Sequence, residues 1–212
     1  TLILLMIAFT LLFVGGVSFF QLATIGVLSV GTIGIFILNE KNYALGRILS
    51  FIDPSSSASI GYQSNQALIG LKQGGWTGMG IGESIQKYSY LPETHTDFIF
   101  AIIGEEMGFI TGSILMLVYY IIFYRAVQIS KRSNDIFGIM LSIGFGLSIT
   151  IYAFINIGVV IGIIPVTGVP LPFVSYGGSS LIINLMMVAI LLNISKAQRK
   201  LNVKRWRLRV NA

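Results

Sequence analysis

The stretch Phe98–Tyr124 reads FIFAIIGEEMGFITGSILMLVYYIIFY, and it decides the fold class. A helix rises 1.5 Å per residue, so about 20 predominantly apolar residues cross the hydrocarbon core of a bilayer. This stretch exceeds that length and carries only two charged residues, Glu105 and Glu106. Two further apolar stretches follow it, Ile136–Ile164 and Ser179–Ile194. We predict a membrane-spanning helix at each of the three.

The composition of the whole chain agrees with this prediction. Of its 212 residues, 54% are hydrophobic and 10% are charged, against about 25% charged in an average soluble domain. The composition therefore excludes a water-soluble globular protein and predicts an all-α, polytopic transmembrane helix bundle. The chain has no cysteine and a single histidine, His95, which excludes disulfides and a multi-histidine metal centre. No cofactor is predicted, and a requirement for a divalent cation is left open.

Three further spans are predicted, and only one of them is weakly apolar. Residues 1–38 carry no charge and are long enough for two spans if the chain reverses near Ser18–Thr24. Residues 60–79 carry several polar side chains, which fit either a span lining a polar cavity or a re-entrant segment. We count this segment as a sixth span. The predicted organisation is a bundle over residues 1–195 and a basic cytoplasmic tail over residues 196–212.

Lysine and arginine set the expected orientation. Seven of the 14 basic residues lie in residues 196–212, three in residues 125–135 and two in residues 39–59. Since such residues favour the cytoplasmic side, we place these segments and the C-terminus there. The turn near Gln21 and the loops 80–97 and 165–178 then lie outside. The net charge of +6 is explained by topology and anionic membrane lipids rather than by nucleic acid.

One external segment holds most of the reactive side chains. Four carboxylates, the only histidine and one lysine occur within 20 residues. They are Lys87, Glu93, His95, Asp97, Glu105 and Glu106. The run from Thr94 to Asp97 also has the pattern of a helix capping box. A capping role and a catalytic role for Asp97 are both open, since one residue can do both.

The second candidate segment is the proline-rich loop that precedes the last span. Its Gly177-Gly178-Ser179-Ser180 turn opens a helix whose free amides suit an anion such as phosphate. A simple helix cap by Ser179 or Ser180 is the alternative. Glycines also recur every four residues at positions 70, 74, 78 and 82 and at 104, 108 and 112. This spacing places small residues on one helix face and predicts close helix packing.

Together these motifs resemble the SEDS family (shape, elongation, division and sporulation) of bacterial cell-wall polymerases of the RodA, FtsW and SpoVE type. The matching pieces are Gly61-Tyr-Gln, the run from Gln86 to Gly108, Asn156-Ile-Gly and the run from Pro170 to Ser180. Such proteins have ten transmembrane helices. The chain begins inside an apolar run without an initiator methionine, so we expect it to be the last six helices of a longer protein.

The resemblance implies a peptidoglycan glycosyltransferase that uses lipid II, an undecaprenyl-pyrophosphate-linked disaccharide, as donor and acceptor. It implies Asp97 as the catalytic general base, with Glu93, His95, Glu105 and Glu106 in supporting roles. By their chemistry, the candidates for substrate binding are Lys87, Ser175, Tyr176, Gly177, Gly178 and Ser179. The implied partner is a class B penicillin-binding protein, which is a transpeptidase.

Two other functions fit the same residues. Polar and charged side chains within spans, such as Lys72 and Glu105, also suit a lipid II flippase or another polytopic transporter. A scaffold that only binds the transpeptidase is the third hypothesis. The motifs do not separate the elongation, division and sporulation subgroups.

Overall fold

The structure is a computed structural model, and it describes residues 2–39, 60–86, 96–133 and 135–210. These residues form six helices. The helices are α1 (Leu2–Val14), α2 (Phe19–Asn39), α4 (Ile60–Gly74), α6 (Ile99–Arg132), α7 (Ile136–Val160) and α8 (Gly178–Val210). The described part of the chain contains no strand, so the prediction of an all-α bundle is confirmed.

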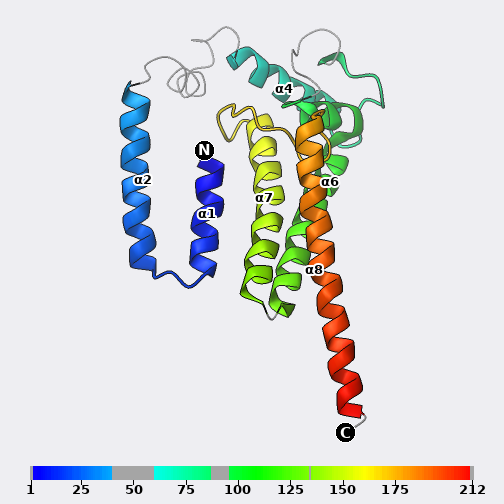
Figure 1. Ribbon diagram of the computed structural model, residues 1–212. Coiled ribbons are helices and arrows are strands. Elements are labelled where there is room, and N and C mark those ends of the chain that lie inside the picture. Colours follow the sequence, from blue (N-terminus) through cyan, green and yellow to red (C-terminus); the bar gives the residue numbers. More distant parts are fainter. Residues whose placement is uncertain (1, 40–59, 87–95, 134, 211–212) are drawn as a thin grey trace.

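Three of the helices are long and apolar enough to cross a membrane. They are α6, α7 and the part of α8 up to Gln198. They run side by side, with α7 next to α6 and α8, while α1 packs on α7 (Figure 1). Large apolar side chains stay exposed along them, for example Phe109, Phe137 and Leu192, as lipid-facing surfaces require. The chain is therefore a membrane protein.

The segment predicted as a sixth span differs from the prediction. Its helix, α4, has 15 residues, or about 22 Å at 1.5 Å per residue, and it is not among the helices long and apolar enough to cross. It ends at Gly74, and glycine turns follow where the prediction continued the helix to Met79. In Figure 1, α4 lies across one end of the bundle. We call this end, where residues 75–86, 96–98 and 161–177 lie, the site end.

Because residues 60–79 do not form a span, the predicted topology has to be corrected. The turn between α1 and α2 lies at the same end of the bundle as the α6–α7 turn and the C-terminus, opposite the site end (Figure 1). It covers Gly15–Ser18, slightly before the predicted position, and Gly16 there has a positive φ of 87°. The prediction that this turn shares a face with loops 80–97 and 165–178 is wrong. Residues 40–59, with Lys41 and Arg47, lie outside the described residues.

Helices α4 and α6 do lie close together, as the glycine spacing predicts. Only some of the spaced glycines, however, lie on one face of a helix. Gly74 lies against the Gly104 carbonyl oxygen, which a Cβ at position 74 would overlap. Gly78 and Gly82 lie beyond the end of α4 with φ of 86° and 89°, and Gly108 interrupts α6 with φ of 77°. The single-face interpretation is therefore wrong for Gly78, Gly82 and Gly108.

At the interruption around Gly108, α6 and residues 75–80 form backbone hydrogen bonds with each other. The N–H groups of Met79 and Gly80 donate to the carbonyls of Glu105 and Glu106, at 2.9 and 3.0 Å. In return, the N–H groups of Phe109 and Ile110 donate to the carbonyls of Gly75 and Trp76, at 2.9 and 3.3 Å. Residues 75–80 thus form hydrogen bonds with backbone groups of α6 that would pair within the helix if it were continuous. In an apolar environment such backbone groups need a hydrogen-bond partner.

The Gly74 contact gives a stability prediction. Gly74→Ala places a methyl group on the Gly104 carbonyl and should destabilise the folded protein by about 1–3 kcal/mol, the usual range for overpacking. The measurement is thermal unfolding in detergent. Gly31→Ala on α2 is the control, because nothing lies within 4 Å of its added Cβ. Equal transition temperatures for the two variants would contradict the close approach.

Candidate active site

Three segments from different parts of the sequence meet at the site end. Asp97 lies directly before α6, Asn156 lies in the last turn and a half of α7, and residues 161–177 join α7 to α8. All three belong to motifs that the sequence singled out. The fold therefore brings the predicted motifs together around Asp97.

Asn156 joins two of these segments through its side-chain amide. Its Nδ2 donates to the main-chain carbonyl of Asp97 at 2.7 Å and to the main-chain carbonyl of Val169 at 2.7 Å. The residue is 1% exposed. Both amide hydrogens are therefore used, and each is donated to a backbone carbonyl outside the helices.

The side chains of Ser175 and Tyr119 form further hydrogen bonds that hold the same loop. The Ser175 hydroxyl donates to the Thr96 carbonyl at 2.5 Å and accepts from the Leu171 N–H at 2.7 Å. The Tyr119 hydroxyl of α6 donates to the Pro172 carbonyl at 2.6 Å. The loop after α7 and the residues before α6 are thus held together by side chains that lie in the protein interior.

The carboxylate of Asp97 is directed at this loop. Its Oδ2 lies 3.5 Å from the position that a Cβ would take on Gly168. Gly168 has φ of 70°, a conformation that favours glycine. Asp97 itself is half-buried, so its carboxylate is held near the protein surface rather than in the core.

The structure does not place Asp97 in the predicted capping box. The N-cap of α6 is Phe98, which has no side-chain cap, and the helix begins at Ile99. Asp97 therefore precedes the helix, and the capping role that the pattern left open does not apply to α6. The reason is tertiary: its carbonyl is held by Asn156 from α7 instead of entering the first helical turn.

Glu105 lies two turns inside α6 and is 0% exposed. Its carboxylate accepts a 2.5 Å hydrogen bond from the Ser84 hydroxyl and a 3.1 Å hydrogen bond from the Ile85 N–H. Gly70 of α4 packs next to this carboxylate, since a Cβ built on it would lie 3.5 Å from Glu105 Oε2. Glu105 thus anchors the segment that leads into the loop 80–97.

The other predicted residues separate into two groups. Glu106 is half-buried, and its Oε1 is buried without a hydrogen-bond partner among the described residues. No described contact joins Glu105 or Glu106 to Asp97. Lys87, Glu93 and His95 lie outside the described residues.

The predicted anion-binding turn borders a cavity of about 450 Å³. The cavity is lined by Ile99, Phe173, Val174, Ser175, Tyr176, Gly177, Gly178 and Leu181. Helix α8 begins at Gly178, and the Ser180 hydroxyl donates to the Gly177 carbonyl. Ser179 and Ser180 therefore lie inside the first turn, and the prediction that one of them is the N-cap is wrong.

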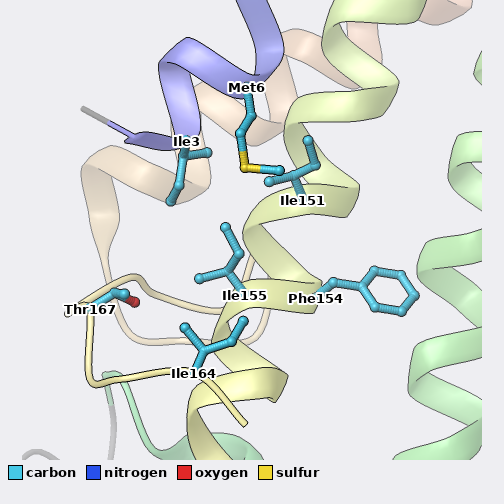
Figure 2. Close-up of a pocket in the computed structure, with 7 residues that line it drawn as sticks. All are labelled: Ile3, Met6, Ile151, Phe154, Ile155, Ile164 and Thr167. Atoms are coloured by element: carbon cyan, nitrogen blue, oxygen red, sulfur yellow. The ribbon is translucent and has the colours of Figure 1, made fainter. Parts of the chain in front are cut away.

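A second cavity, of about 380 Å³, opens between α1 and α7 (Figure 2). Ile3 and Met6 of α1 face Ile151 and Ile155 of α7, and Ile164 and Thr167 of the loop close one end. Thr167 is the neighbour of Gly168, which faces Asp97. An apolar cavity between α1 and α7 thus reaches the loop that carries the site.

Sequence reasoning gave no role to Asn156, Tyr119 or Gly168. Asn156 was the most detectable of them, because it is the only amide side chain within Ile136–Ile164, which carries no charge, and polar residues in membrane spans usually have a partner or a function. The hydrogen bond from Tyr119 to Pro172 joins residues 53 positions apart. No local pattern encodes that contact.

Comparisons with known proteins identify the family. The cell cycle protein family of FtsW, RodA and SpoVE matches residues 1–200. The chain is 41% identical over 191 residues to stage V sporulation protein E of Bacillus subtilis, covering 89% of this chain and 52% of that protein. It is 38% identical over 197 residues to the "Probable peptidoglycan glycosyltransferase FtsW" of a Geobacter species, covering 92% and 53%.

A solved structure has the same fold. It is a chain of a peptidoglycan synthase complex with structural coordination of polymerization and crosslinking, 26% identical, with a TM-score of 0.72 over 93% of this chain and 55% of that chain. The chain therefore belongs to the FtsW, RodA and SpoVE family of polytopic membrane proteins. It spans about half the length of the relatives it matches.

The buried position of Glu105 gives a second stability prediction. Glu105→Ala removes the acceptor of the hydrogen bonds from the Ser84 hydroxyl and the Ile85 N–H, and loss of the buried bond from Ser84 should cost about 1–3 kcal/mol. We expect a lower unfolding temperature and faster proteolysis within residues 80–97. Glu106→Ala is the matched control, and an equal effect of both variants would contradict the anchoring role.

Proposed function

We propose that the full-length protein is a peptidoglycan glycosyltransferase that polymerises lipid II, with Asp97 as the general base. The observation that carries the proposal is the position of Asp97, fixed by Asn156 next to Gly168 at one end of a membrane bundle. The support from comparison is that relatives about 40% identical are named as peptidoglycan glycosyltransferases.

The proposed reaction is a displacement at the anomeric carbon of a lipid-linked sugar. A hydroxyl of the acceptor sugar forms the new glycosidic bond, and Asp97 takes its proton. The bond between the anomeric carbon and the pyrophosphate breaks, so undecaprenyl pyrophosphate leaves with the electron pair. A carboxylate suits the first step because it is ionised at neutral pH.

The leaving pyrophosphate needs hydrogen-bond donors or positive charge. The free amides at the start of α8 supply donors next to the 450 Å³ cavity, where Ser175, Tyr176, Gly177 and Gly178 form the wall. We therefore retain these residues, with Ser179 and Lys87, as the proposed substrate-binding set. The apolar side chains of the cavity suit a lipid-linked substrate.

The orientation follows from the basic residues at the opposite end. Arg125, Lys131 and Arg132 lie in the last turns of α6, away from the site end, and α8 carries the basic C-terminal segment in the same direction (Figure 1). By the positive-inside rule, this end is cytoplasmic, and Asp97 is near the outer surface of the bacterial cytoplasmic membrane. Lipid II would be used there.

A transpeptidase is the proposed partner. The support is the solved complex, whose printed description couples polymerization to crosslinking and whose chain has the fold of this protein. A class B penicillin-binding protein supplies crosslinking chemistry next to newly made glycan. Binding of this partner should be independent of the Asp97 carboxylate.

The function predicts a specific effect of removing the base. Asp97→Asn in the full-length protein should reduce glycan polymerisation from purified lipid II by about 100- to 10,000-fold, the usual contribution of a general base. The control is Asp135→Asn, since Asp135 caps α7 at the opposite end of the bundle. Undiminished polymerisation by the Asp97 variant would contradict the proposal.

The same preparations separate the alternative functions. A lipid II flippase would move labelled lipid II across a vesicle without lengthening glycan, and a scaffold would bind the transpeptidase with no polymerisation in either variant. We expect polymerisation by the wild type and by Asp135→Asn.

A further inference from the structure

We propose that Asn156 is a positioning residue for the reaction, whose side-chain amide holds Asp97 and the loop around Gly168 in the arrangement in which the carboxylate acts. This inference rests on the proposed function of Asp97 as the base. Asn156 acts through the backbone of Asp97 and not on the substrate, because its described contacts are to protein carbonyls.

The first support is what its two hydrogen bonds hold. One ends on the carbonyl of Asp97 itself, and the other ends on the carbonyl of Val169, the residue after Gly168. The carboxylate of Asp97 and Gly168 face each other. A single amide nitrogen therefore fixes both the residue that carries the carboxylate and the loop position opposite it.

The second support is the chemistry of the side chain. Two carbonyls at 2.7 Å from one atom need a nitrogen with two hydrogens, which an asparagine amide provides. A carboxylate of the same shape has no hydrogen to give and would repel both carbonyls. A serine hydroxyl has one hydrogen and can serve at most one of them.

The third support is that the Oδ1 of Asn156 is buried without a hydrogen-bond partner among the described residues. An unpaired buried acceptor opposes folding. The amide orientation is nevertheless determined, because the reverse orientation would put oxygen against two carbonyl oxygens. The role of Asn156 is thus donation to the two site segments, not general packing.

The test is steady-state kinetics of the full-length protein with purified lipid II, comparing wild type with Asn156→Ser and Asn156→Asp. Displacement of a reacting group by about 1 Å can lower a rate by about 100-fold. We expect kcat to fall by about 10- to 100-fold in Asn156→Ser and further in Asn156→Asp. The KM for lipid II should stay within about threefold, because transition-state geometry and not substrate binding is lost.

The matched control is Ser142→Ala. Ser142 lies in α7, is 0% exposed and donates only within its helix, to the Gly138 carbonyl. It should leave kcat and KM at the wild-type values. If Asn156→Asp does not accumulate in the membrane, Asn156→Ser decides the question.

Wild-type kcat in Asn156→Ser would overturn the inference, as would a loss confined to KM. Asp97→Asn, measured in parallel, separates this failure from failure of the proposed function. If Asp97→Asn is inactive and Asn156→Ser is fully active, only the positioning role is wrong. If Asp97→Asn is fully active, the proposed base is wrong.

Discussion

The structure depends on one constraint: a backbone polar group inside an apolar bundle must find a hydrogen-bond partner. At Gly108 the constraint is met by backbone alone, through four hydrogen bonds exchanged between α6 and residues 75–80. The exchange requires glycine, because a Cβ at Gly78 or Gly108 would overlap the opposite backbone. This fixes α4 and the start of the loop 80–97 against α6, at the end of the bundle where the site lies.

The same constraint builds the site, but side chains meet it there. The carbonyls of Asp97, Val169 and Pro172 lie outside the helices, and Asn156 and Tyr119 supply donors to them from α7 and α6. These hydrogen bonds fix the backbone of Asp97 and of the loop that its carboxylate faces. A fixed backbone favours the defined geometry that a general base requires.

Much of the fold was readable from the sequence, because apolar length alone identifies α6, α7 and α8. The error at residues 60–79 has a physical cause. Glycines spaced by four indicate helix packing, but Gly78 and Gly108 instead adopt positive φ and let α6 and residues 75–80 form backbone hydrogen bonds with each other. Counting this segment as a span then reversed the side of the α1–α2 turn. For the site, sequence motifs identified Asp97 and the loop 165–178. The hydrogen bonds from Asn156 and Tyr119 join residues far apart in the chain, so no local sequence pattern predicts them.

The central claim is that Asn156 holds the backbone of Asp97, and a distance measurement tests it most directly. In the full-length protein in bilayers, solid-state NMR can measure the separation of the Asn156 Nδ2 and the Asp97 carbonyl carbon with selective ¹⁵N and ¹³C labels. The N···O distance of 2.7 Å and the C=O bond length together place these nuclei less than about 4 Å apart. Dephasing that corresponds to this distance, and that disappears in Asn156→Ser, is the predicted result. A separation beyond about 6 Å, too long for any hydrogen bond, would contradict the account.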